Sequence, residues 1–142
     1  MKIISSIFIV LILLSSCKTA KENSSEKKIS EVFKGSYNIS MLNGENILSK
    51  ELTFSVDFSS KKISGNSGCN TYFADFELSE NNHIYFNNIA TTKLYCASKD
   101  KNEIERKFIS VLANTFDIVL KENEIELKGV KDNSQKIILV KS

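Results

Sequence analysis

Apolar and polar residues alternate in many short runs along this chain, and this pattern restricts the fold more than any other feature. The clearest run covers residues 52–58, where Leu, Phe, Val and Phe alternate with Thr, Ser and Asp. A side-chain period of two is that of a half-buried β-strand. Less regular runs predict further strands at residues 37–41, 72–78, 84–86, 118–120, 125–127 and 137–140.

Turn-forming residues separate these runs. They lie at residues 43–44, 59–60, 80–82, 122–123 and 132–134, and are rich in Asn, Gly, Ser and Asp. About seven or eight short strands at this spacing are typical of an antiparallel sandwich or barrel. The sequence therefore predicts a mainly β fold.

One segment departs from the alternation and predicts an amphipathic helix. Its apolar residues are spaced i, i+4, i+7 and i+8: Ile104, Phe108, Val111 and Leu112. This is the spacing of one helix face. Asp100 followed by Glu103 resembles a capping box, and the helix is expected to end near residues 113–115. We expect the apolar face to pack against the sheet as core rather than to bind a cofactor or partner.

The N-terminus predicts export and lipid anchoring. Lys2 precedes an apolar stretch at residues 3–14, which is too short to span a bilayer but typical of a secretory signal. Leu14-Ser15-Ser16-Cys17 resembles a bacterial lipobox, which implies a lipoprotein signal peptide at residues 1–16 and acylation of Cys17. The alternative is an ordinary signal peptide with an incidental cysteine.

The residues after Cys17 predict a tether. Residues 18–28 contain no large apolar side chain, so we expect residues 17–32 to form a lipidated, flexible linker and residues 33–142 to form the folded domain. Lipoproteins of double-membrane bacteria with Asp after the lipidated cysteine tend to stay in the inner membrane. Lys18 occupies that position, which favours the outer membrane.

Composition excludes several classes of function. With 19 Lys+Arg against 17 Asp+Glu, the net charge of +2 is too small to predict a nucleic-acid partner. His83, Cys69 and Cys96 supply at most three zinc ligands and lack the usual spacing, so we expect no metal and no cofactor. His83 fits a surface position at the start of a strand better than a catalytic role.

Cys69 and Cys96 are expected to form a disulfide. Acylation consumes Cys17, which leaves an even pair in an exported protein, where disulfides persist. The alternative is two separate buried thiols that pack as small apolar groups. A redox-active pair is disfavoured because no C-x-x-C spacing is present.

Two motifs resemble the META domain family, the family of the heat-shock protein HslJ. They are Gly68-Cys69-Asn70, which follows Gly65, and Thr92-Lys93-x-x-Cys96. The resemblance covers about residues 33–142. Tyr37 stands where the family pattern has Trp, and Leu94-Tyr95 stand where it has Met-Ala.

The resemblance implies a small antiparallel β-barrel-like sheet, lipocalin-like in shape, with one helix. It also implies an envelope protein associated with stress responses or motility. No catalytic residues are established for the family, so none is assigned here. Whether the barrel interior is hollow or filled with aromatic side chains stays open.

Two functions fit these observations. The first is a non-catalytic envelope module that supports stress tolerance and binds an envelope protein, a cell-wall component or a small apolar ligand. The second is an envelope hydrolase that uses Lys93 with Thr91, Thr92 or Asn70 and a carboxylate. The hydrolase requires Lys93 to be desolvated so that it can act as a base, whereas the module leaves Lys93 exposed.

We expect Cys17→Ser to abolish membrane association. Stable anchoring needs two or more acyl chains, and Cys17 carries them on its sulfur and its new amino group. Fractionation of cells after a high-salt wash checks this. A variant that remains with the membranes would exclude anchoring through Cys17.

Overall fold

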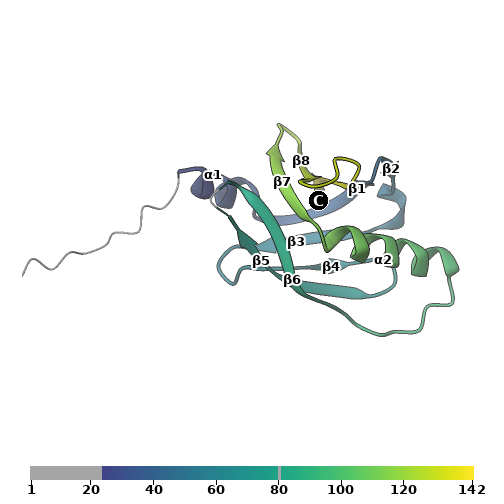
Figure 1. The fold of residues 1–142 in the computed structure, drawn as a ribbon. Helices are drawn as coiled ribbons and strands as arrows, with labels where there is room; N and C mark the ends of the chain where they lie inside the picture. Colours follow the sequence, from purple (N-terminus) through teal and green to yellow (C-terminus); the bar gives the residue numbers. More distant parts are fainter. Residues whose placement is uncertain (1–23, 80) are drawn as a thin grey trace, which may run out of the picture.

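The computed structural model describes residues 24–79 and 81–142, and it is a β-barrel with two helices (Figure 1). The elements in chain order are α1 (Ser24–Val32), β1 (Gly35–Leu42), β2 (Glu45–Asn46), the 3-10 turn η1 (Leu48–Lys50), β3 (Thr53–Asp57), β4 (Lys62–Asn66), β5 (Thr71–Leu78), β6 (His83–Thr91), α2 (Lys99–Leu112), β7 (Thr115–Leu120), β8 (Glu124–Gly129) and β9 (Lys136–Lys141).

All strand pairs are antiparallel, and the sheet closes on itself. The order is β2-β1-β3-β4-β5-β6-β7-β8-β9, and β1 also pairs with β9. Strand β1 closes the barrel because Gly35 to Asn38 pair with β3, while Tyr37 to Leu42 pair with β9. Closure protects these strands from edge-to-edge aggregation. The predicted mainly β, barrel-like fold is confirmed.

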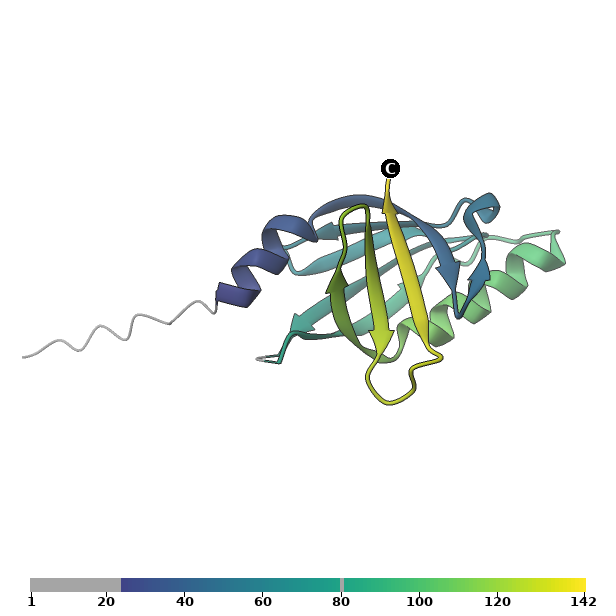
Figure 2. The same ribbon diagram turned by 90° about the horizontal axis from the view of Figure 1, so that it is seen from above.

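Aromatic side chains fill the interior in one connected series. Ring centroids 4.9–6.4 Å apart link nine of them: Phe33, Tyr37, Phe54, Phe58, Tyr72, Phe76, Phe86, Phe108 and Phe116. Phe33 follows α1 and Phe108 belongs to α2, and Figure 2 shows these helices on opposite sides of the barrel. The sequence left open whether the barrel interior is hollow. Along this series, aromatic side chains fill it.

Helix α2 confirms the predicted apolar face but begins earlier than predicted. Its four buried residues are Ile104, Phe108, Val111 and Leu112. The N-cap is Ser98, whose backbone is extended and whose Oγ accepts a hydrogen bond from the Lys101 amide at 3.3 Å. The predicted cap at Asp100 is wrong, because Asp100 lies inside the first helical turn. Ser98 has the side chain that an N-cap needs.

The predicted flexible tether is wrong for residues 24–32, which form α1. Ile29 is 5% exposed and Phe33 is fully buried. These residues lie one helical turn apart, so both reach the barrel, and the Phe33 amide donates to the Ile29 carbonyl at 2.7 Å. Two apolar side chains suffice to dock this segment. Residues 17–23 and the predicted signal peptide at residues 1–16 lie outside the described residues.

Strand β4 was not predicted, because its pattern is interrupted by a glycine. Of its five residues only Ile63 is buried. A Cβ at Gly65 would lie 2.1 Å from the Thr53 carbonyl oxygen of β3, so only glycine permits this backbone approach.

Among the described helices, neither is long and apolar enough to cross a membrane.

We expect Ile29→Ala to lower the free energy of unfolding by about 2–5 kcal/mol, because it removes a buried side chain that joins α1 to the core. Urea unfolding measures the change. Lys28→Ala, at an exposed position of the same helix, is the matched control and should stay within about 0.5 kcal/mol of the native protein. Equal stability of both variants would restore the flexible-tether interpretation.

Candidate functional site

The turn between β4 and β5 contains the Gly68-Cys69-Asn70 motif and packs against α2. The Ser67 amide donates to the Asn70 carbonyl at 2.8 Å, which closes the turn. Gly68 has a φ of +113°, and a Cβ there would lie 2.8 Å from Ile104 Cγ2. Glycine is therefore required both for the backbone conformation and for the close approach of α2.

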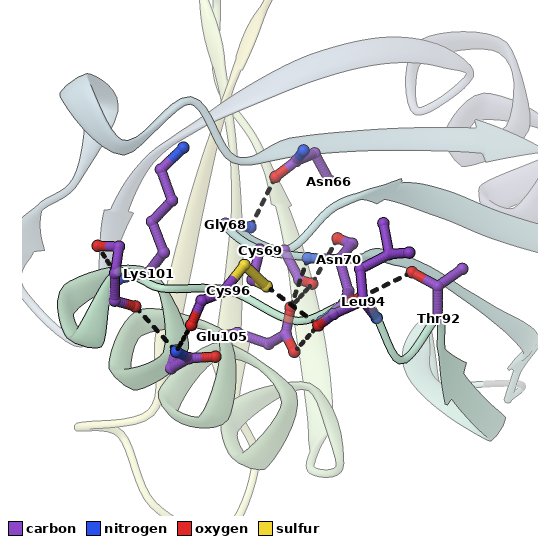
Figure 3. The surroundings of a disulfide bond; sticks show 12 residues. Asn66, Gly68, Cys69, Asn70, Thr92, Leu94, Cys96, Lys101 and Glu105 are labelled. Carbon is purple, nitrogen blue, oxygen red and sulfur yellow. Dashed lines mark hydrogen bonds between the residues drawn. A yellow bond between two sulfur atoms is a disulfide. The ribbon is translucent and has the colours of Figure 1, made fainter.

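Glu105 of α2 is the acceptor at the centre of this region (Figure 3). Its Oε2 accepts from Ser67 Oγ at 2.6 Å and from the Asn70 amide at 2.8 Å, and its Oε1 accepts from Asn70 Nδ2 at 2.9 Å. Partial burial by itself raises the pKa of the Glu105 carboxyl. The hydrogen bonds from Ser67 and Asn70 outweigh that effect, so the pKa lies below its usual value.

Asn70 transmits this contact to the segment that follows β6. Its side chain is 5% exposed, and while Nδ2 binds Glu105, Oδ1 accepts from Thr92 Oγ1 at 2.9 Å and from the Leu94 amide at 2.7 Å. The Thr92 amide also donates to the Thr71 carbonyl at 2.9 Å. One buried amide thus connects the turn, α2 and the segment between β6 and α2.

The same segment is held a second time by the predicted disulfide. Cys69 and Cys96 are bonded, with Cα atoms 6.0 Å apart, within the usual range for a disulfide. They are 27 positions apart, so the bond restricts the unfolded chain by roughly 3.5 kcal/mol in the chain-entropy account. Asn102 of α2 adds a hydrogen bond from Nδ2 to the Cys96 carbonyl at 2.9 Å. We call residues 92–98 the pinned loop.

The pinned loop holds two large apolar side chains in solvent. Tyr95 is 94% exposed and Leu94 is 69% exposed. Hydrogen bonds or the disulfide attach residues 92, 94, 96 and 98, with Leu94 attached through its backbone amide. The side chains of residues 93, 94, 95 and 97 are exposed. The loop is therefore a fixed frame that presents Leu94 and Tyr95 outward.

The hydrolase alternative finds no support in this geometry. Lys93 is exposed, and the Thr92 hydroxyl donates to Asn70. The Glu105 carboxylate accepts its hydrogen bonds from Ser67 and Asn70 of the turn. The exposure of Lys93 contradicts the desolvation that the hydrolase requires of it.

His83 begins β6, as predicted, and is half-buried. Its Nδ1 lies 2.5 Å from Asp117 Oδ1 of β7, at the end of the β6–β7 ladder. Within the described residues, no group of three or more His, Cys, Asp or Glu side chains is arranged to hold a metal ion.

Sequence reasoning missed Ser67, Asn102 and Glu105. The available signal was the position of Glu105 beside Ile104, at the margin of the apolar helix face, where an acid is half-buried and needs donors. Nothing in the sequence pattern alone indicated that the donors would come from the turn before β5.

Comparisons with known proteins agree with this architecture. The sequence model of the META domain matches residues 27–141. An NMR structure of a protein from Burkholderia xenovorans is 18% identical with a TM-score of 0.62, covering 81% of this chain and 87% of that one. A DUF4847 family protein from Bacteroides vulgatus is 14% identical with a TM-score of 0.58, covering 80% and 97%. At these identities the likeness concerns the fold alone. No curated protein sequence matches the chain.

We expect Glu105→Gln to lower the free energy of unfolding by about 1.5–3 kcal/mol at neutral pH, because a charged acceptor is lost. A carboxyl whose pKa is lowered by folding stabilises the native state above its unfolded value of 4.5, and this contribution disappears as the pH falls through the native pKa. The difference between native and variant proteins should therefore shrink on acidification to about pH 3.

Urea unfolding at both pH values measures this difference. Glu103→Gln, at an exposed position on the same helix, is the control and should change stability by less than about 0.5 kcal/mol at either pH. A difference for Glu105→Gln that does not depend on pH would show that its charge contributes nothing.

Proposed function

This chain belongs to the META domain family, and on that premise we propose that it is a non-catalytic binding module of the bacterial cell envelope. The module is anchored by lipid at Cys17, in the outer membrane, and engages its partner through the pinned loop. Its role in stress tolerance follows from that interaction and not from turnover of a substrate.

The observation that carries this proposal is the exposure of Leu94 and Tyr95 on a loop that is fixed at several points. Burying a side chain of this size is worth about 1.5–3 kcal/mol, and the fold forgoes that gain at both positions. Tyrosine is enriched among the residues that dominate binding energy at interfaces. Because the disulfide and Asn70 already order the loop, little conformational entropy remains to be lost on binding.

The position of the loop suits an anchored protein. Figure 2 places α1 at one side of the barrel and the start of α2, which follows the pinned loop, at the other. Seven residue steps separate Cys17 from Ser24, so the anchor is attached within about 25 Å of the first residue of α1. The domain would then present Leu94 and Tyr95 away from the membrane that holds it.

The aromatic series favours an external partner over a small apolar ligand in the barrel. Phe54, Tyr72 and Phe108 connect the two helices through the interior, and all three are fully buried. A ligand would have to displace these close-packed rings. The outer surface of the loop is the better-supported place for binding.

A photocrosslinking probe tests the proposal in intact cells. Tyr95→benzoylphenylalanine keeps an aromatic side chain at the tip of the loop, in the otherwise native lipidated chain. Irradiation should give a discrete adduct, detected by immunoblotting of the membrane fraction, because a bound partner lies directly against this side chain.

The same probe at Val119 of β7, which is 38% exposed, is the matched control and should give no adduct of that mass. A protein that gives no adduct from position 95, or the same adducts from both positions, does not bind through the pinned loop.

A further inference from the structure

The pinned loop and the first turn of α2 carry a local excess of positive charge. Residues 92–101 contain Lys93, Lys99 and Lys101 against a single acid, Asp100, which gives this segment a net charge of +2. All three lysines are exposed.

These three lysines are among the lysines of the described residues that form no ion pair. Lys62, Lys107, Lys121 and Lys136 each form an ion pair with a carboxylate. Across residues 24–79 and 81–142, Lys93, Lys99 and Lys101 form none. Their ammonium groups are therefore exposed and outside any ion pair of the described residues, with Asp100 as the one acid among residues 92–101.

We propose that the pinned loop docks onto an acidic protein surface, with Tyr95 and Leu94 inserted in an apolar pocket and Lys93, Lys99 and Lys101 facing carboxylates at the pocket rim. This inference rests on the proposed function and names the class of its partner. The apolar pair supplies most of the binding energy, and the lysines accelerate encounter and exclude basic surfaces.

A lipid surface is the competing occupant, because tyrosine, leucine and lysine also suit a membrane interface. The geometry favours a protein. Helix α1, which follows the anchor in sequence, lies on the opposite side of the barrel from the pinned loop (Figure 1). An anchor on the α1 side therefore directs Tyr95 away from its own membrane. The fixed backbone of the loop also matches a shaped pocket better than a fluid bilayer.

Charge reversal combined with the probe at position 95 tests the class of partner. The loop variant carries Lys93→Glu, Lys99→Glu and Lys101→Glu in the lipidated chain. The matched control carries Lys27→Glu, Lys28→Glu and Lys34→Glu, at exposed positions in and beside α1. We expect adduct yield to fall about tenfold or more in the loop variant and to change less than about twofold in the control, since steering depends on charges near the contact.

Mass spectrometry of the adduct gives the second readout. The proposal expects a cross-linked peptide from a protein whose contacted surface is rich in Asp and Glu. An adduct the mass of a phospholipid, or one released only by digestion of the cell wall, would overturn it in favour of a membrane or a glycan.

The outcomes separate this inference from the proposed function. An adduct that forms with unchanged yield after loop charge reversal would overturn the acidic partner and leave the binding module intact. An equal fall in both triple variants would also overturn it, because the effect would then come from the net charge of the chain. Thermal unfolding of each variant confirms that the exposed substitutions leave the fold in place.

Discussion

A single buried amide, that of Asn70, connects three segments that lie outside the strands: the turn before β5, α2 and the pinned loop. Its nitrogen donates to Glu105 of α2 and its oxygen accepts from Thr92 and Leu94. An asparagine in this position must satisfy both ends, because an unpaired polar atom in the interior is costly. The turn, the helix and the pinned loop therefore hold their relative positions together, and loss of any one leaves polar groups of the others without partners.

An element could be predicted from the sequence when several of its residues are apolar and share one buried face. In β3, buried Phe54 and Val56 alternate with less buried residues, so the period of two is visible in the sequence. Helix α2 was equally clear because four apolar residues share one face. Strand β4, with only Ile63 buried, and α1, docked by Ile29 and Phe33, depend on too few side chains to produce a periodic pattern.

The candidate site was predictable in part. The cysteine pair followed from the number of cysteines and from the export that the N-terminus predicts, without any knowledge of the fold. Glu105 did not follow, because its donors, Ser67 and Asn70, come from a turn that only the fold brings near α2. Ser98 was missed for a local reason: Asp100, two residues later, also has a side chain suited to an N-cap. Leu94 and Tyr95 stand where the family pattern has Met-Ala, and two large apolar side chains would ordinarily be expected in a core. The structure places both in solvent instead, because the backbone of Leu94 and the sulfur of Cys96 already satisfy the contacts with the domain.

The alternation of anchored and exposed positions in the pinned loop has a consequence for how such a domain can diversify. Residues 92, 94, 96 and 98 attach the loop, while the side chains of residues 93, 95 and 97 are exposed. New side chains at these three exposed positions would change the surface that the loop presents and should change stability by less than about 0.5 kcal/mol. The loop thus behaves as a cyclised peptide displayed on a rigid scaffold, suited to exchange of its recognition sequence by natural variation or by library selection.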